Sequence, residues 1–400
     1  MEWKLKDLTV DGKGSYGIGA PAVPYQEDKL TYLRITDIND DGSLNFSDLK
    51  SVDAEDAEKY ILKENDIVFA RTGNSTGRSY FYEKQHGTFV YAGFLIKFSL
   101  DPHKVNPRIL KYYTHSKPYF DWVNSFDTGG TRGNINAKTY GDMEIELPSR
   151  KVQDNIVSIL SSLDRKIELN NKINADLEEM AQAIFNNWFV DFEPFKDGKF
   201  VESELGMIPE GWKVGTLTDI ASYLNGLAMQ KFPPENKNES LPVLKIKELG
   251  QGFCNMDSDR CSSNIKNEYK IHNGDVIFSW SGTLLVDIWC GGDCGLNQHL
   301  FKVTSNDYPK WFYYYWTKYH LKEFIHIAKD KAVTMGHIKR GHLEEALVVI
   351  PDTKSLSKAN ELYIPLLENI ISLRLESSRL SHLRDTLLPK LMSGELEVSE

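Results

Sequence analysis

The pattern of apolar positions in residues 1–150 is that of short strands with one helix. Apolar runs bounded by turn-forming residues predict strands at 32–38, 66–71, 88–91, 94–100 and 143–147. Segment 107–121 has the spacing of a helix with an aromatic face that includes Tyr112, Tyr113 and Tyr119. This mixture of elements predicts an α+β domain.

The pattern changes to that of a long helix at position 152. Residues 152–189 contain neither Pro nor Gly, and apolar residues recur along them seven positions apart. Such heptads predict a coiled-coil helix, about 57 Å long at 1.5 Å per residue. The two seams run through Ile156, Leu163, Asn170, Leu177 and Ile184, and through Leu160, Ile167, Asn174 and Ala181.

Asn170 and Asn174 interrupt the apolar seams near the centre of this helix. One interpretation is that both side chains are buried and fix the register of a helix pair, as buried Asn does in other coiled coils. The alternative is that the seam slips at this point and both side chains face solvent.

A second heptad pattern closes the chain. Leucines recur at intervals of seven from Leu366 to Leu387. Pro365 predicts a first turn or a kink, and Gly394 predicts the end of the helix. An isolated amphipathic helix is marginal in water because its apolar stripe is exposed. The two long helices are therefore expected to pack antiparallel and to hold the globular domains apart.

Much of the first domain recurs in the second half of the chain, at offsets of 203 to 211 residues. The matching segments are 3–8 with 212–217, 33–38 with 244–249, 66–69 with 275–278, and 133–135 with 336–338. The second copy also has an aromatic helix, at 309–325. A period this long is outside the range of solenoid repeats and predicts two similar domains related by a pseudo-dyad. Such a molecule suits a target with two halves, of which DNA is the obvious one.

The net charge of −10 argues against indiscriminate binding of nucleic acid, but the charge is unevenly distributed. Residues 71–138 contain ten Lys and Arg against four Asp and Glu, and residues 302–340 contain eight against three. These basic stretches fall at corresponding places in the two repeats. They therefore predict two local faces that attract phosphate, although two solvated faces could also cluster by chance.

The remaining composition indicates a cytoplasmic chain. No apolar segment approaches the roughly 18 residues of a membrane span, and the N-terminus lacks an apolar signal region. Cys254, Cys261, Cys290 and Cys294 do not have the spacing of zinc knuckles, so we expect reduced structural thiols and no metal.

Motifs for catalysis are missing from the sequence. It contains no phosphate-binding P-loop, no dinucleotide fingerprint, and no Asn/Asp-Pro-Pro-aromatic tetrapeptide of an amino-methyltransferase. Residues 268–270 and 235–237 each fit only the short Glu-x-Lys half of a nuclease pattern, and such triplets are common in a chain this charged. We therefore expect no catalytic residue.

Two loops in each repeat have the composition of DNA-contacting loops. In the first repeat they are 71–78, where two arginines flank small and hydroxylated residues, and 128–138; their counterparts are 279–283 and 329–340. The alternative for each is an ordinary solvated turn. The candidate contact residues are Arg71, Thr72, Asn74, Ser75, Thr76, Arg78, Thr131, Arg132, Asn134, Lys138, Trp280, Ser281, Thr283, Lys329, Lys331, Thr334, His337, Lys339 and Arg340.

Two segments resemble the central and distal conserved regions of the specificity subunits of type I restriction–modification systems. The central one contains Leu147-Pro148-Ser149, Gln153-Asp154-Asn155-Ile156, Leu163-Asp164-Arg165-Lys166-Ile167, Met180-Ala181-Gln182-Ala183-Ile184-Phe185 and Trp188-Phe189. The distal one contains Leu383-Arg384-Asp385-Thr386-Leu387-Leu388-Pro389-Lys390-Leu391-Met392-Ser393-Gly394. Two departures are the absence of a Glu-Gln pair in 354–362 and Ser149-Arg150-Lys151 in place of a second proline. They leave the start of the distal helix open.

The resemblance implies an α+β protein in which two similar target-recognition domains are separated by two long helices that form an antiparallel coiled coil. The implied domains are target-recognition domain 1 at 1–150, the central conserved helix at 151–192, target-recognition domain 2 at 193–353 with its linker at 193–211, and the distal conserved helix at 354–400.

The resemblance also implies a division of labour. Each domain would read one half of a bipartite, asymmetric site in double-stranded DNA, and the helices would act as a ruler for the gap. Two methyltransferase subunits would carry S-adenosylmethionine, and motor/nuclease subunits would supply ATP- and Mg-dependent cleavage. This chain would bind no cofactor itself. The alternatives are a coiled-coil scaffold that binds proteins, a self-contained nuclease, or the recognition part of another class of restriction enzyme.

Overall fold

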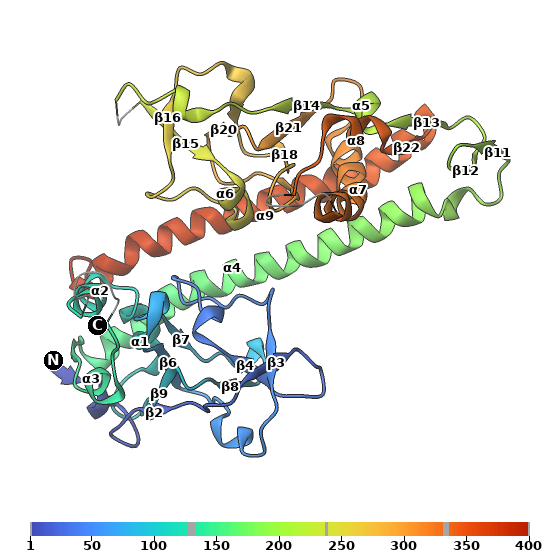
Figure 1. Cartoon of the computed structure of the whole chain (residues 1–400). Helices are drawn as coiled ribbons and strands as arrows, with labels where there is room; N and C mark the ends of the chain where they lie inside the picture. The colour runs from blue at the N-terminus through green and yellow to red at the C-terminus, as the bar shows by residue number, and fades with distance from the viewer. Residues whose placement is uncertain (1, 127–132, 237–238, 331–335, 399–400) are drawn as a thin grey trace. The chain divides into compact units, whose positions relative to one another are not determined.

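Two compact units make up the chain in the computed structural model, which describes residues 2–126, 133–236, 239–330 and 336–398 (Figure 1). One unit contains Met1–Arg165 and Ser381–Glu400, and the other contains Lys166–Leu380. The boundary crosses two long helices, α4 (Arg150–Phe185) and α9 (Thr353–Ser393). Each unit therefore holds one α+β domain together with a part of both helices.

The first domain is built on an antiparallel sheet in the order β2–β9–β6–β7. A second sheet has the order β3–β5–β4–β8, in which β4 is antiparallel to β5 and parallel to β8, and β1 pairs with β10. The strands are β1 (Glu2–Lys4), β2 (Ser15–Tyr16), β3 (Ala22–Pro24), β4 (Thr31–Leu33), β5 (Lys50–Val52), β6 (Asp66–Ala70), β7 (Ser79–Phe81), β8 (Phe89–Tyr91), β9 (Leu95–Ser99) and β10 (Glu144–Glu146). The helices are α1 (Pro107–Tyr113), α2 (Lys117–Asn124) and α3 (Ala137–Gly141).

The central strand β6 has apolar residues at successive positions because it is buried on both faces. Ile67 and Phe69 face one hydrophobic cluster, and Val68 and Ala70 face another. Since side chains alternate along a strand, a strand covered on both faces needs apolar residues at every position.

The second domain repeats this topology. Its sheet has the order β14–β21–β18–β19, its strand β15 is antiparallel to β16 and parallel to β20, and β13 pairs with β22. The strands are β13 (Lys213–Thr216), β14 (Ser222–Asn225), β15 (Ser240–Leu244), β16 (Arg260–Ser262), β17 (Lys270–Ile271), β18 (Val276–Ser279), β19 (Leu285–Ile288), β20 (Cys294–Leu296), β21 (Leu300–Thr304) and β22 (Leu347–Ile350). The helices are α5 (Leu217–Ile220), α6 (Ile246–Gln251), α7 (Lys310–Asp330) and α8 (Arg340–Glu345). The predicted duplication of an α+β domain is confirmed.

One part of the predicted repeat is out of register. The backbone N–H of Leu5 donates to Met143 O at 3.0 Å, and that of Leu217 donates to Ala346 O at 3.0 Å. Leu5 therefore corresponds to Leu217, and the match of Trp3 with Trp212 was wrong by three positions. Trp212 lies ahead of strand β13, where its ring packs against Phe195 with centroids 4.8 Å apart.

Three predicted elements are shorter or more structured than the sequence indicated. The strand predicted at 32–38 ends at Leu33, because the Asp37 carboxylate accepts the Arg34 backbone N–H at 2.8 Å and closes a 3-10 turn. The helix predicted at 107–121 is broken between Tyr113 and Lys117 into α1 and α2, because Pro118, in the first turn of α2, has no N–H to donate back to the Thr114 carbonyl and continue α1. The segment 193–211, predicted as a linker, contains a hairpin of β11 (Phe200–Ser203) and β12 (Gly206–Pro209).

The distal helix begins earlier than Pro365. Asp352 caps it, since its carboxylate accepts the Ser355 backbone N–H at 2.7 Å, and α9 then runs through Pro365 without ending. Of the two alternatives predicted for Pro365, the first turn was wrong, and the kink stays a prediction. Gly394 adopts φ of +75°, a left-handed conformation typical of the residue that follows a helix, which confirms the predicted end.

The two long helices are antiparallel neighbours. In the second unit Asn170 Nδ2 of α4 donates to Glu376 Oε2 of α9 at 2.8 Å, and farther along α4 the Ala181 carbonyl accepts from Tyr363 Oη at 3.1 Å. Position therefore rises along α4 as it falls along α9. Within the first unit Arg384 of α9 donates to Asp164 of α4 at 3.1 Å.

Both helices complete the cores of the domains. In the first unit Ile156 and Leu160 of α4 and Leu388 and Leu391 of α9 are buried in the cluster that also contains Ile145. In the second unit the ring of Tyr363 stacks on Trp311 of α7, with centroids 4.2 Å apart.

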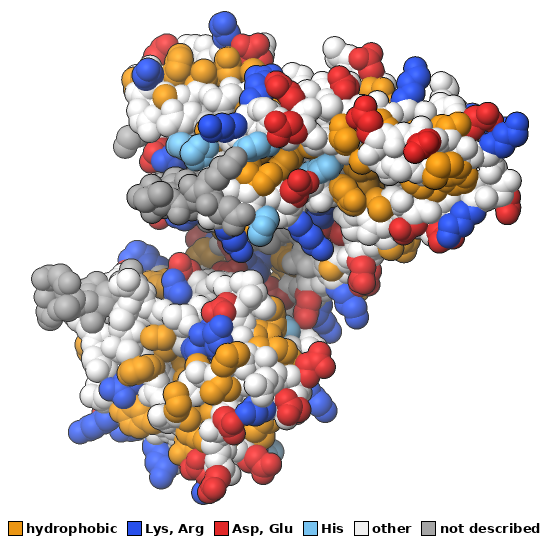
Figure 2. Space-filling model, turned by 45° about the vertical axis from the view of Figure 1, so that its right-hand side comes forward, with side chains coloured by type: hydrophobic (Ala, Val, Ile, Leu, Met, Phe, Trp, Pro, Cys, Tyr) orange, Lys and Arg blue, Asp and Glu red, His pale blue; other side chains and the backbone are white. Residues whose placement is uncertain are grey.

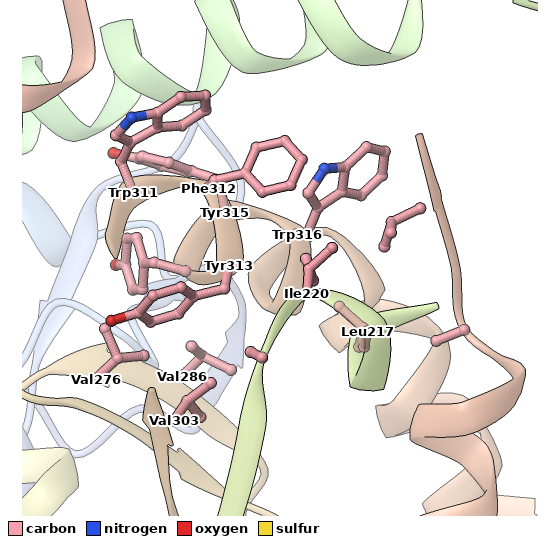
Figure 3. Packing of buried hydrophobic residues seen from close by; sticks show 14 of the residues in the cluster. Leu217, Ile220, Val276, Val286, Val303, Trp311, Phe312, Tyr313, Tyr315 and Trp316 are labelled. Carbon is pink, nitrogen blue, oxygen red and sulfur yellow. The ribbon is translucent and has the colours of Figure 1, made fainter. Parts of the chain in front are cut away.

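The aromatic helix α7 packs on both of its sides. Figure 3 shows Tyr313 near Val276 and Val286 of the sheet, with Trp311 and Trp316 on the other side of α7. The aromatic residues at 311–316 are thus core residues that bridge the sheet and the long helices.

The two central asparagines are buried. Asn170 is 0% exposed and Asn174 is 6% exposed, so the interpretation that they face solvent was wrong. Neither the amide nitrogen nor the oxygen of Asn174 has a hydrogen-bond partner among the described residues. A buried amide without partners lowers stability, because water is lost and nothing replaces it.

We expect Asn174→Leu to raise the free energy of unfolding by about 1–3 kcal/mol, since it removes this unpaired amide and adds an apolar contact. Thermal and urea unfolding of the full chain measure the change. Asn171→Leu is the matched control, because Asn171 is exposed on the same helix and gains no burial. A lower stability for Asn174→Leu than for the control would contradict the expectation.

Candidate nucleic-acid interface

The two candidate loops of each domain lie side by side. In the first domain the backbone N–H of Ile135 donates to Arg71 O at 3.0 Å. In the second domain Ile338 N–H donates to Trp280 O at 3.1 Å. The loop after the central strand therefore meets the segment before α3 or α8 through the same backbone bond in both domains. Predicted separately along the sequence, the two loops form one surface in the fold.

Two further segments join this surface in each domain. Arg71 N–H donates to Phe94 O at 3.1 Å, and the Arg71 guanidinium lies 5.0 Å from the centroid of the Tyr16 ring. Correspondingly, Trp280 N–H donates to His299 O at 3.4 Å. The interface thus consists of four segments around the residue that follows the central strand.

The second domain fills the Tyr16 position with a different residue. Trp280 Nε1 donates to Asn225 Oδ1 at 3.0 Å, and the offset from Tyr16 to Asn225 equals that from Arg71 to Trp280, 209 residues. The sequence prediction missed Tyr16, Phe94, Asn225 and His299. The repeat offset would have paired Tyr16 with Asn225, but no charge or loop composition draws attention to either residue.

A glycine holds the first of these segments close to the sheet in each domain. A Cβ on Gly17 would lie 2.2 Å from Tyr91 O, and a Cβ on Gly226 would lie 2.2 Å from Asn297 O. Both obstacles are backbone carbonyls, which cannot move aside as a flexible side chain can. Glycine is therefore required beside Tyr16 and beside Asn225, and it fixes where these two side chains stand.

The candidate residues differ in accessibility. Exposed side chains are Asn74, Asn134, Lys138, Thr283, Lys329, His337, Lys339 and Arg340. Half-buried side chains are Arg71, Thr72, Thr76, Arg78 and Trp280, and buried side chains are Ser75 and Ser281. Thr131, Arg132, Lys331 and Thr334 lie outside the described residues.

Arg71 and Arg78 flank the same loop but have different surroundings. Arg78 Nε donates to Asp40 Oδ1 at 2.7 Å, and Arg78 Nη1 donates to Ile38 O at 3.0 Å. Arg71 donates only from Nε, to Asn134 Oδ1 at 3.3 Å, among the described residues. Arg78 is therefore held by the protein, whereas the terminal nitrogens of Arg71 are available to a ligand.

Behind this loop the first domain has a cavity of about 180 Å³, lined among others by Asn74, Arg78, His115 and Phe120. Burial lowers the pKa of His115 below its ordinary value, so the imidazole is neutral at neutral pH. Its Nδ1–H donates to Lys111 O at 2.8 Å. The cavity thus presents a neutral ring and an arginine already paired with Asp40, an arrangement that supports the loop.

The described residues contain no group of three or more His, Cys, Asp or Glu side chains placed to hold a metal ion. Cys254, Cys261, Cys290 and Cys294 are free thiols. No helix among the described residues is long and apolar enough to cross a membrane.

The family model for the type I restriction modification DNA specificity domain matches residues 16–179 and 209–360. The chain belongs to this family. Each match starts in or just ahead of one of the two α+β domains and runs into the long helix that follows it. The resemblance inferred from the central and distal segments is confirmed.

Two relatives in this family are similar over most of their length. The type I restriction enzyme MjaIX specificity subunit of Methanocaldococcus jannaschii is 32% identical over 302 residues, covering 73% of this chain and 69% of that protein. The type I restriction enzyme HindI specificity subunit of Haemophilus influenzae is 22% identical over 409 residues, covering 84% and 88%.

The fold is also shared with a solved structure. The S subunit of a type I restriction–modification system from M. genitalium aligns with a TM-score of 0.57 at 17% identity, over 100% of this chain and 96% of that chain. The predicted arrangement of α+β domains and long helices is therefore the fold of specificity subunits.

We expect Gly226→Ala to destabilise the specificity subunit by about 1–3 kcal/mol, the usual cost of forcing an atom into a packed site. Differential scanning calorimetry of the full chain measures the effect. Gly250→Ala is the matched control, because it lies in helix α6 with nothing within 4 Å of a new Cβ. Equal stability of the two variants would show that the contact with Asn297 O does not constrain the Asn225 segment.

Proposed function

We propose that this specificity subunit reads a bipartite, asymmetric site in double-stranded DNA, with one target-recognition domain on each half. The observation that carries the proposal is the four-segment interface, which has the same backbone bonds in both domains and different side chains at its centre. A shared frame explains how both domains dock on the same kind of polymer. Different side chains explain why the two half-sites need not be alike.

The charges of the interface support DNA as the ligand. Lys138 in the first domain and Lys329, Lys339 and Arg340 in the second are exposed near the loops, although the whole chain carries a net charge of −10. Figure 2 shows lysine and arginine side chains on the surfaces of both domains. On the second domain several histidine side chains are visible as well. Local cations of this kind attract phosphate even on an acidic protein.

In this proposal the subunit is a non-catalytic part of an assembly in the cytoplasm. Two methyltransferase subunits bind it and carry S-adenosylmethionine, and motor/nuclease subunits carry ATP and Mg²⁺. The specificity subunit contributes the choice of site and binds none of these cofactors. The two relatives described above are named specificity subunits of type I restriction enzymes, which supports a role of this chain in the choice of site.

Methylation mapping tests the proposal. We expect the genome of the host to carry one split methylated motif, with two half-sites and a constant gap, that disappears when this locus is disrupted and returns on complementation. A purified complex with the methyltransferase should enrich the same motif from a random duplex pool. Failure of both experiments to yield a split motif would favour a protein-binding scaffold.

A second expectation concerns the helices as a ruler. Insertion of four residues after Asn170 in α4 and four before Glu376 in α9 keeps the Asn170–Glu376 contact on one side of both insertions and adds about 6 Å. We expect the accepted gap to lengthen by about two base pairs while both half-sites stay the same, because the domains themselves are unchanged. Methylation mapping of the variant measures the gap.

The control is the same four-residue insertion after Met256, which is 99% exposed in the second domain. This control should leave the gap unaltered. A changed half-site in the helix variant, or an unchanged gap, would contradict the role of the helices as a ruler.

A further inference from the structure

Three side chains occupy equivalent places at the centre of the interface in the two domains. The first triad is Tyr16, Arg71 and Phe94, and the second triad is Asn225, Trp280 and His299. In each domain the backbone N–H of the middle residue donates to the carbonyl of the third, at 3.1 Å from Arg71 and 3.4 Å from Trp280. In each domain the side chain of the middle residue contacts the first, at Tyr16 or at Asn225.

The first triad presents a preorganised guanidinium beside the exposed ring of Tyr16. Phe94 is 59% exposed and Tyr16 is 43% exposed, although both are large apolar side chains. The Tyr16 ring and the bond from Arg71 Nε to Asn134 Oδ1 hold the guanidinium from two sides. Tyr16 is itself held, since its hydroxyl accepts the Ala137 backbone N–H at 3.1 Å. The Arg71 side chain is therefore already ordered before a ligand binds. Little conformational entropy is lost when its terminal N–H groups contact a ligand.

The second triad presents an amide and carries no permanent cation. Asn225 is exposed, and its oxygen is occupied by the Trp280 indole N–H at 3.0 Å. That bond fixes the amide orientation and leaves Asn225 Nδ2 as a donor without a partner among the described residues. His299 lies beside Trp280, with ring centroids 6.0 Å apart.

These two chemistries match different base edges. A guanidinium that offers two N–H groups in one plane matches O6 and N7 of guanine in the major groove. A single fixed amide N–H₂ matches one acceptor, for which purine N7 is available on both adenine and guanine. The terminal groups of Arg78, held by Asp40 and the Ile38 carbonyl, are not placed for either role.

We propose that the triads are the specificity-determining centres of the two domains. Arg71, aligned by Tyr16 and Asn134, contacts a guanine of the first half-site. Asn225, aligned by Trp280, contacts the N7 edge of a purine in the second half-site. This inference rests on the proposed function and deepens it, because it assigns base contacts to Arg71 and Asn225 and makes Tyr16 and Trp280 the residues that position them.

The experiment uses the full chain in complex with its methyltransferase, and duplexes in which single purines of the motif carry 7-deaza bases, which lack N7. Binding is measured by fluorescence anisotropy at fixed salt. For the wild type we expect one 7-deazaguanine in the first half-site to weaken binding on the order of tenfold or more. Arg71→Ala should weaken binding to the natural duplex to a similar extent. The same 7-deaza substitution should then cause no further loss, because the contact is already gone.

The matched control is Arg78→Ala, in the same loop and with the same loss of charge. In this variant the 7-deaza substitution should still weaken binding by the same factor as in the wild type. Arg71→Lys keeps the charge but cannot donate in the same fork, so it should behave like Arg71→Ala. It also serves if Arg71→Ala does not fold.

In the second domain Trp280→Phe keeps a ring but removes the N–H that orients Asn225. We expect it and Asn225→Ala to abolish the effect of one 7-deazapurine in the second half-site and to leave the first half-site unchanged. A merely structural role for Trp280 would instead weaken binding without changing the response to that base.

If the loss of affinity caused by Arg71→Ala adds to the loss caused by each 7-deazaguanine of the first half-site, the two changes remove independent contacts. That result would overturn the assignment of Arg71. If the loss of affinity caused by Asn225→Ala adds to that caused by a 7-deaza base at every purine of the second half-site, the assignment of Asn225 is overturned. If the wild-type complex selects no split motif, the proposed function fails before any variant is compared. If it selects one and no coupling is found, only the triads are wrong.

Discussion

The apolar stripes of α4 and α9 are the constraint on which the rest of the molecule depends. Neither stripe can be left in water, and each helix covers only part of the other. The domains cover the remainder. In the first unit the end of α9 is buried with the start of α4 under the first domain. In the second unit Tyr363 of α9 and Phe185 of α4 join the aromatic cluster around Trp311. A domain of this protein is therefore completed by helices that belong to both halves of the sequence.

Charged pairs between α4 and α9 occur in both units, with the acid on α4 in two of them and with Lys166 of α4 paired to Glu376 of α9 in the opposite sense. Asp164 and Glu178 lie on α4, and their partners Arg384 and Arg374 lie on α9. Burial raises the pKa of Asp164, but Lys111 and Arg384 outweigh burial, so the pKa lies below its ordinary value. Removal of one partner would leave a largely buried charge without its counter-ion, which is destabilising. The Asn174 amide, which has no hydrogen-bond partner among the described residues, is a second feature of the helix pair that costs stability.

Some of this structure could be predicted from the sequence. The heptads of α4 and α9, the duplicated α+β domains and the two loops of each domain all follow from short-range patterns. The end of α9 at Gly394 belongs to the same group. Local hydrogen bonds and one proline account for the differences: Asp37 stops a strand early, and Pro118 divides a helix that continues in the second domain. The match of Trp3 with Trp212 failed because identity of residues is a weaker guide to equivalence than the pairing of Leu5 and Leu217 with the sheet.

The sequence by itself determined that the chain has two copies of one frame, a pair of long helices, and loops of different composition on each copy. Only the tertiary structure decided which residues stand together at the centre of each interface. Tyr16, Arg71, Phe94 and Asn134 are far apart along the chain. The sequence around Tyr16 and Phe94 does not indicate that either residue contacts DNA. They meet because the sheet order β2–β9–β6–β7 brings the ends of non-consecutive strands to one edge, and because Gly17 allows the backbone to approach the Tyr91 carbonyl. Patterns of local sequence carry helix and strand preference, whereas strand order is set by long-range pairing that no local pattern encodes.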